Sequence, residues 1–267
     1  MPITTVQLGQ LEYLQADGIA VPHCFTTRRG GVSSGYLSSL NLGAHRGDEL
    51  QNVEKNYAIL ADLLEISPEA FVLTRQTHSD IVRKVGRADW GHHMEKDASP
   101  ECDGLITNDP GTALVIFTAD CTPILLHDPV TGAVGACHAG WRGTAADIAG
   151  KTVRAMTAHF GSDPANIRAA IGPNIAQCCF ETDADVPNAM VAALGDAAKE
   201  HIIQRGEKYY VNLKAINAQF LHRAGVRHVE LSDACTACRT DLYWSHRRMG
   251  QSRGSQGAII VCKEGLG

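Results

Sequence analysis

Three short apolar runs occur in residues 113–143, ALVIFTADCTPILLHDPVTGAVGACHAGWRG. They cover 113–117, 123–126 and 133–137, and each is bounded by Asp, Pro or Gly, as β-strands are. Three consecutive strands with such tight connections favour antiparallel or mixed sheets that are covered by helices.

The flanking sequence predicts further helices and strands. Apolar residues at helical spacing predict helices over 50–65, 186–203 and 212–224, and a fourth that Thr144 caps and Gly161 ends. Strands are expected over 70–73, 81–85, 167–171 and 258–262, and loops over 24–46 and 86–103. Helices and strands mix without a regular βαβ alternation, so the predicted class is α/β or α+β, as one domain.

Composition excludes several classes of protein. The chain has 267 residues, of which 44% are hydrophobic and 20% charged. Its formal net charge of -5 does not indicate the excess of basic residues that binding to nucleic acid requires. No apolar run approaches the roughly 20 residues needed to cross a membrane, and the first residues lack the pattern of a signal peptide. Nine cysteines without a disulfide-scaffold spacing favour a reducing compartment, so we expect a cytoplasmic protein.

His78, Cys121 and His138 are the candidate metal ligands. Cys121 and His138 lie just after, or at the end of, apolar runs, where a sheet can aim side chains into a pocket. Two imidazoles and a thiolate suit a zinc-type ion, and three protein ligands leave a position open, as in catalytic sites. Their long separations match no zinc-finger pattern, so the spacing alone leaves ordinary core or surface residues as the alternative.

Arg142-Gly143-Thr144 stands at a predicted helix start and suggests an anion site. The first amides of a helix lack partners and its dipole favours negative charge, while an adjacent arginine can grip phosphate with two hydrogen bonds. A surface arginine beside an N-cap is the equally simple alternative.

The remaining cysteines and histidines favour structural explanations. Cys235 and Cys238 have C-x-x-C spacing without a second such pair, and the adjacent Cys178 and Cys179 offer poor geometry for binding one metal, so all four are interpreted as structural thiols. The pair His92-His93 is interpreted as solvated loop histidines.

An ordered set of motifs resembles the YfiH-like family, also called the laccase-domain, polyphenol oxidase or peptidoglycan editing factor family. The most specific are A-D-C-x-P at 119–123 and H-A-G-W-R-G at 138–143. The others are FTTR at 25–28, GGVS at 30–33, LNLG at 40–43, QTH at 76–78, DGLIT at 103–107, GPNI at 172–175, CCFE at 178–181 and SHRR at 245–248.

The resemblance implies a single α/β domain, here 1–267, with layered mixed or antiparallel sheets flanked by helices. It also implies a zinc site on His78, Cys121 and His138. The sequence departs from the family's pattern at His246, where an aromatic residue is frequent, and at Phe180, where Tyr is common. Both residues lie outside the set of metal ligands, so they affect the expected substrate contacts and not the metal site.

The leading functional hypothesis is a zinc-dependent purine nucleoside enzyme, as implied by the resemblance. It would catalyse phosphorolysis of adenosine, inosine, guanosine and methylthioadenosine, and deamination of adenosine. Asp120 is the candidate acid/base beside the three metal ligands. The candidates for binding substrate or phosphate are Arg142, Arg28, Asn41 and Arg247.

Three alternatives belong to other classes. A copper-dependent polyphenol oxidase (laccase) needs clustered histidines, and the sequence shows no H-x-H pair; copper taken up by a zinc site explains oxidase behaviour more simply. A cysteine hydrolase in peptidoglycan editing would use Cys121 as nucleophile with His138 or His78 as base. A non-catalytic binding protein would show no turnover when loaded with metal.

Overall fold

Two six-stranded sheets face each other at the centre of the molecule. The computed structural model describes residues 3–91, 99 and 101–263. The first sheet has the order β1 (Ile3–Leu8), β2 (Leu11–Ala16), β3 (His23–Thr26), β15 (Gln256–Val261), β7 (Ala113–Thr118) and β4 (Phe71–Val72). The second has the order β14 (His228–Leu231), β10 (Arg168–Ile171), β8 (Thr122–His127), β9 (Val134–Ala139), β6 (Gly104–Thr107) and β5 (Val82–Lys84).

Both sheets are mixed, as the short connections predict. Strands β7, β8 and β9 follow one another, and the turn between β7 and β8 carries the chain from the first sheet to the second. The pairs β4–β7, β5–β6 and β10–β14 are parallel, and the other strand pairs of these two sheets are antiparallel.

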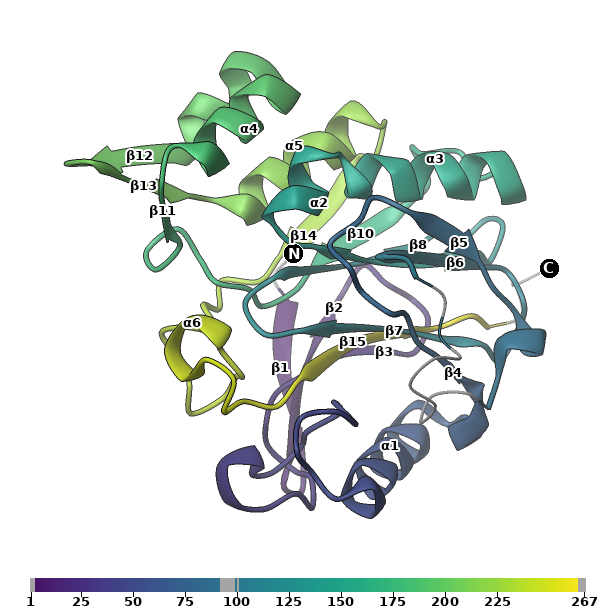
Figure 1. Ribbon diagram of the computed structural model, residues 1–267. Helices are drawn as coiled ribbons and strands as arrows, with labels where there is room; N and C mark the ends of the chain where they lie inside the picture. Colours follow the sequence, from purple (N-terminus) through teal and green to yellow (C-terminus); the bar gives the residue numbers. More distant parts are fainter. Residues whose placement is uncertain (1–2, 92–98, 100, 264–267) are drawn as a thin grey trace.

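Helices cover the outer faces of the two sheets (Figure 1). Helix α1 (Leu50–Leu64) packs on the first sheet. The second sheet is covered by α2 (Trp141–Ala145), α3 (Ile148–Phe160), α4 (Asp185–Leu194) and α5 (Leu213–Arg223). The smaller elements are a sheet of β11 (Glu181–Thr182), β13 (Lys208–Val211) and β12 (Ile202–Arg205), helix α6 (His246–Met249), and 3-10 helices over Gly35–Leu37, Pro68–Ala70, Arg87–Asp89 and Gly195–His201.

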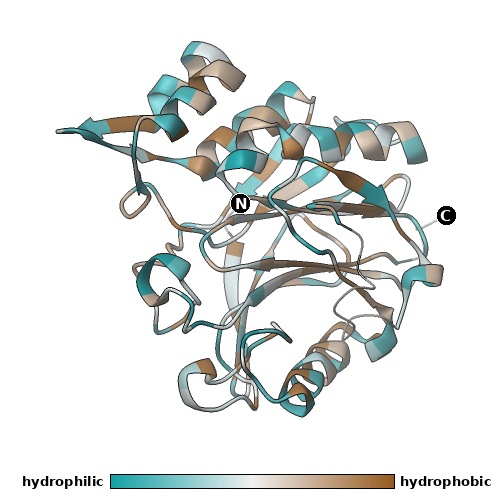
Figure 2. Ribbon diagram, viewed as in Figure 1, coloured by the Kyte–Doolittle hydropathy of each residue, from teal (hydrophilic) through white to brown (hydrophobic). Residues whose placement is uncertain are grey.

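The central strands are apolar on both faces because both faces are buried. In β7, Leu114 and Ile116 point between the sheets, whereas Val115 points toward α1. Strand β8 alternates in the same way, with Leu125 between the sheets and Ile124 toward the helices. Figure 2 shows the result as apolar strands in the middle of the molecule and a hydrophilic α6 at its edge.

Most predicted elements are present, with shifted ends. The helix expected over 50–65 is α1, and Gly161 ends α3 in a left-handed conformation as predicted. The expected helix over 186–203 is shorter, because α4 ends at Leu194 and a 3-10 helix and β12 follow. Strands β1, β2, β6, β11, β12, β13 and β14 and helix α6 were not predicted, and β3 overlaps the start of the expected loop over 24–46.

The prediction that Thr144 caps a helix is wrong. Thr144 lies inside α2, where its hydroxyl accepts a hydrogen bond from Asn217 at 2.9 Å. The next helix, α3, is capped by Asp147, whose carboxylate accepts from the backbone N–H of Gly150 at 2.9 Å. The carboxylate satisfies one of the unpaired amides of the first turn.

The structure describes part of the expected loop over 86–103. Arg87–Asp89 form a 3-10 helix within it, while His92-His93 lie outside the described residues. Among the helices that the structure describes, none is long and apolar enough to cross a membrane.

The layer between the two sheets should dominate stability. Ile116 is fully buried there, so Ile116→Ala should lower the free energy of unfolding by about 2–5 kcal/mol through lost burial and a residual cavity. The matched control is Ile203→Ala in β12, where the side chain is 42% exposed, with an expected loss of about 1 kcal/mol or less. Urea unfolding of both variants measures the difference; equal losses would contradict this view of the core.

Candidate metal centre

His78, Cys121 and His138 come together at one end of the two facing sheets. His78 lies between β4 and β5, Cys121 in the turn between β7 and β8, and His138 near the end of β9. One ligand atom from each lies within 4.8 Å of the others. The Cys121 Sγ is 3.9 Å from the His78 Nε2, and the two imidazole centroids are 5.0 Å apart.

Asp103 orients both histidines. Its carboxylate accepts a 2.7 Å hydrogen bond from the His138 Nδ1, and it also accepts from the backbone N–H groups of Thr77, His78 and Ser79 at 3.1, 3.2 and 2.7 Å. Fixing Nδ1 in this way leaves Nε2 of His138 for a ligand, as outer partners of metal-binding histidines do.

The backbone is held in rare conformations around this centre. His78 has φ 61° and Asp120, directly before Cys121, has φ 92°. Non-glycine residues adopt such angles at a cost of about 1–3 kcal/mol, and they cluster at functional sites. At Gly140 a side chain cannot fit, because an added Cβ would lie 2.7 Å from the His78 Cδ2 and 3.3 Å from the Cys121 Sγ.

The three side chains strongly perturb one another. Burial by itself would raise the pKa of the Cys121 thiol, but the neighbouring His138 and His78 outweigh it and lower that pKa to about 6. Burial by itself would lower the pKa of His138, but the Cys121 thiolate and Asp103 raise it to about 9. The hydrogen bonds from His138 and Ser79 overcome the effect of burial on Asp103 and lower its pKa to about 2.

The donor set fits a zinc-type ion. A tetrahedral site with Zn–N near 2.0–2.1 Å and Zn–S near 2.3 Å places its ligand atoms roughly 3.3–3.8 Å apart, close to the spacing of Cys121 and His78. A thiolate is already favoured at Cys121, and Asp103 fixes the His138 ring. These three residues could therefore hold a metal with a fourth position facing the cavity beside them.

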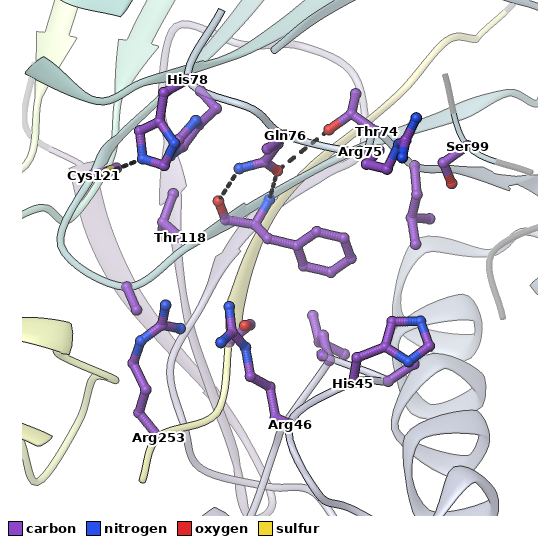
Figure 3. Close-up of a pocket in the computed structure, with 18 residues that line it drawn as sticks. His45, Arg46, Thr74, Arg75, Gln76, His78, Ser99, Thr118, Cys121 and Arg253 are labelled. Carbon is purple, nitrogen blue, oxygen red and sulfur yellow. Dashed lines mark hydrogen bonds between the residues drawn. The ribbon is translucent and has the colours of Figure 1, made fainter. Parts of the chain in front are cut away.

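A cavity of about 450 Å³ adjoins the three residues, within the usual size range for ligand pockets. Its wall includes all three, together with His45, Arg46, Arg75, Gln76, Phe117, Thr118 and Arg253. In Figure 3, the guanidinium groups of Arg46 and Arg253 extend into the cavity from the side opposite His78 and Cys121. Among the described residues, no carboxylate of this wall or elsewhere forms an ion pair with either arginine.

Gln76 shapes the wall between these groups. Its side chain donates to the carbonyl oxygen of Phe117 at 2.8 Å and accepts from the backbone N–H of the same residue at 2.7 Å (Figure 3). Both ends of the amide are thus occupied by the end of β7. Gln76 therefore ties the loop that carries His78 to the first sheet.

Asp120 is adjacent to the ligand set and does not line the cavity. Its carboxylate accepts from the Thr236 hydroxyl and from the backbone N–H of Arg247, both at 2.6 Å, and the side chain is buried. These contacts fix the turn that presents Cys121. A role for Asp120 in proton transfer stays a prediction.

The four predicted substrate or phosphate residues also lie outside the cavity lining. Arg142 is exposed and stacks on Trp141 at 4.2 Å, and Arg28 stacks on Trp244 at 3.7 Å. Arg247 donates to two backbone carbonyl groups, and Asn41 is fully buried.

Asn41 nevertheless shapes the cavity wall. It accepts hydrogen bonds from the backbone N–H groups of Gly43 and Ser255, two wall residues, both at 3.0 Å. Its side chain thereby joins two loops that lie more than two hundred residues apart in the chain.

The sequence patterns did not indicate Asp103, Arg46 or Arg253 as site residues. Asp103 carries a weak signal, since it is an acidic residue directly ahead of the apolar strand β6. Arg46 and Arg253 lie in polar loops where arginine is ordinary, and only the fold shows that both face one cavity.

Comparison with known proteins places the chain in a family. Residues 22–263 match the family described as multi-copper polyphenol oxidoreductase laccase, and the chain belongs to this family, as its resemblance to YfiH-like proteins implies. The chain is 37% identical over 241 residues to the purine nucleoside phosphorylase YlmD of Geobacillus stearothermophilus, covering 88% of this chain and 87% of the relative.

Two further comparisons agree with this placement. The purine nucleoside phosphorylase YfiH of Escherichia coli is 35% identical over 238 residues, which are 89% of this chain and 91% of the relative. The crystal structure of YlmD from Geobacillus stearothermophilus superposes with a TM-score of 0.92 at 34% identity, covering 98% of this chain and all of that one.

Asp103→Asn should weaken metal binding without unfolding the protein. The amide group would place a donor where Asp103 now accepts several hydrogen bonds, and loss of such outer partners costs about 10- to 100-fold in metal affinity. Competition with a chromophoric chelator measures the affinity. Asp109→Asn is the matched control, because Asp109 accepts from the backbone N–H of Arg87 away from the centre; equal effects would contradict the role of Asp103.

Alkylation of Cys121 in chelator-treated protein should reach half its maximal rate near pH 6. A lowered pKa means that the thiolate is present above about pH 6 and is lost as the pH falls through that value. Iodoacetamide labelling resolved by peptide mass spectrometry measures the profile. In His138→Gln the half-point should move up toward the ordinary value of 9.0, and an unshifted profile would show that His138 is not the cause.

Proposed function

We propose that the protein is a zinc-dependent purine nucleoside phosphorylase that also deaminates adenosine. The proposed substrates are adenosine, inosine, guanosine and methylthioadenosine, with inorganic phosphate. The names of the relatives support the phosphorylase class. The observation that carries the proposal is that one cavity joins a three-ligand centre to Arg46 and Arg253, neither of which forms an ion pair with a described residue.

The cavity can take an anion and a nucleoside together. Burial, together with the neighbouring positive charge of Arg46, lowers the pKa of Arg253 to about 10. A bound phosphate would relieve the repulsion and accept hydrogen bonds from both guanidinium groups. We therefore assign phosphate binding to Arg46 and Arg253 in place of Arg142, Arg28 and Arg247.

In phosphorolysis, a phosphate oxygen bonds to the C1′ atom of the ribose while the bond from C1′ to the base breaks. Holding phosphate against the sugar is the main contribution of Arg46 and Arg253, since positioning replaces an encounter in solution. The departing base takes up a proton, and we assign its donation to His45, the histidine of the described cavity wall outside the ligand set.

In deamination, water replaces the amino group of adenosine. A zinc ion held by His78, Cys121 and His138 would supply Lewis-acid chemistry and lower the pKa of water to about 7. The chain itself contributes a fixed ligand geometry through Asp103 and a wall that holds the nucleoside. Because this reaction needs no bound anion, its dependence on Arg253 should be small.

Arg253→Gln should therefore impair phosphorolysis far more than deamination. Loss of a charge-assisted contact costs ~1.5–3 kcal/mol, which is roughly a 10- to 150-fold drop in rate at limiting phosphate. The assay follows adenosine with and without phosphate, measuring inosine, free base and ribose 1-phosphate. Arg142→Gln is the matched control, because that arginine is exposed outside the cavity.

The outcome distinguishes two anion sites. If Arg142→Gln shows the selective loss and Arg253→Gln does not, phosphate binds at the start of α2 and the cavity assignment is wrong. If Arg253→Gln slows both reactions equally, the arginine shapes the cavity without binding phosphate. His45→Gln in the same assay should lower kcat for phosphorolysis, and an unchanged kcat would remove His45 as proton donor.

One observation favours a second candidate function, a cysteine hydrolase. Cys121, His138 and Asp103 form a series in which the thiol has a lowered pKa and the imidazole is oriented by a carboxylate. Such an arrangement can activate a nucleophile. Cleavage of a peptidoglycan amide by the chelator-treated protein, with no turnover of nucleosides by the metal-loaded protein, would establish the hydrolase instead.

The copper oxidase stays the other alternative. Among the described residues, His78, Cys121 and His138 form the one potential metal cluster that contains histidine, and no methionine is part of the described cavity wall. A multicopper enzyme needs further histidine clusters. Elemental analysis of the purified protein, with oxidation of a phenol measured before and after chelation, separates this alternative from a zinc enzyme.

A further inference from the structure

Four cysteines form a second cluster outside the proposed active site. Cys178 and Cys179 come from the segment after β10, and Cys235 and Cys238 from the segment after β14. Their sulfur atoms all lie within 4.8 Å of one another. The expected poor geometry of the adjacent Cys178 and Cys179 for one metal is not found, because the turn at 176–180 directs both sulfurs to the same point.

The sheet brings the two cysteine segments side by side. Strands β10 and β14 are parallel neighbours, so both segments leave the second sheet at the same edge. A backbone bridge joins Asn174 to Cys235, and the Thr236 N–H donates to the Asn174 carbonyl at 3.0 Å. Ile175, Cys235 and Ala237 form a small apolar cluster beneath. The cluster of thiols is thus built by the fold.

The spacing of the sulfurs matches a tetrahedral four-thiolate metal site. With Zn–S near 2.3 Å, such a site separates its sulfurs by about 3.8 Å. The Cys178 Sγ lies 3.7 Å from both the Cys179 Sγ and the Cys238 Sγ, and the last two are 3.4 Å apart. Cys178, Cys179, Cys235 and Cys238 are free thiols in this structure.

Hydrogen-bond donors and positive charges lie around the four sulfurs. The backbone N–H of Ala176 donates to the Cys235 Sγ at 3.3 Å, and the Arg248 guanidinium approaches the Cys179 Sγ at 3.7 Å. Four thiolates around a divalent ion carry a net charge of about minus two, which a neighbouring arginine offsets. The buried Lys214, whose ammonium group donates to the carbonyl oxygens of Ser232 and Ala234, adds a second positive charge nearby.

We propose that Cys178, Cys179, Cys235 and Cys238 bind a second zinc ion in a closed, structural site. Four protein ligands leave no position for water or substrate, which is the mark of a structural site. The proposal is independent of the nucleoside chemistry, since none of the four residues lines the cavity.

The position of this site gives it a defined structural task. Thr236 lies between the two ligands of the C-x-x-C segment, and its hydroxyl donates to Asp120 at 2.6 Å. Arg247, whose backbone N–H also donates to Asp120, anchors its guanidinium on the carbonyl oxygen of Cys179 at 2.9 Å. A metal at the four thiols would therefore fix the two partners of Asp120, and through Asp120 the turn that presents Cys121.

Reciprocal variants of the full chain test the proposal by metal content. The wild-type protein should contain two zinc ions per chain by elemental analysis. Cys238→Ser and Cys121→Ser should each lose one ion, the first from the four-thiol site and the second from the His/Cys/His centre. Cys262→Ser is the matched control: this cysteine is buried away from both clusters, and its sulfur faces the Gly132 carbonyl, which a serine can also reach.

X-ray absorption spectroscopy at the zinc edge of Cys121→Ser gives a second measurement, in which all four cysteines of the proposed structural site are unchanged. The remaining zinc should show a shell of sulfur alone near 2.3 Å. One zinc in the wild type with none lost in Cys238→Ser would overturn the proposal. So would a mixed nitrogen and sulfur shell, iron in place of zinc, or a disulfide among the four cysteines in freshly purified protein. Loss of the Cys121-dependent zinc alone would count against the proposed active site and leave the four-thiol site standing.

Discussion

The buried ion pair between Asp103 and His138 is the constraint on which the rest of the site depends. One carboxylate accepts from the imidazole on β9 and from three consecutive backbone amides of the His78 loop. Asp103 thus holds the His78 loop against β9. A buried carboxylate is stable when it is paired and hydrogen-bonded, and here both conditions are met. Contacts within the protein therefore fix the positions of His138 and the His78 loop relative to each other.

The sequence predicts the layers well because the central strands are buried on both sides. Continuous apolar runs such as 113–117 leave little choice except a buried strand, and α1 shows a clear helical stripe. The edge strand β1 was missed because most of its residues are polar or exposed and give little apolar pattern. Thr144 was mistaken for a cap because the chain makes two helices there, and Asp147 offers a carboxylate at the second start.

The ligands could be proposed from sequence, but the cavity could not. His78, Cys121 and His138 are chemically distinctive and lie near recognisable strands or motifs. Arg46 and Arg253 come from two loops far apart in the sequence, which Asn41 joins through the backbone N–H groups of Gly43 and Ser255. The four cysteines likewise meet through the pairing of β10 with β14, which no local pattern reveals. Contacts between residues far apart in the sequence could therefore not be predicted from the sequence alone.

The place of strand β15 has a consequence for how the first sheet folds. Strand β15 lies in the middle of this sheet, between β3 and β7, and Arg253 stands just before it. It pairs Gln256 with Thr118 and Ala258 with Phe25, residues far apart in the sequence, and the cavity wall that carries Arg253 is complete only when these pairs have formed. Such long-range pairing forms slowly, because the entropy of closing a long loop is lost before the new contacts stabilise the sheet, and until then the edges of β3 and β7 stay exposed to other chains.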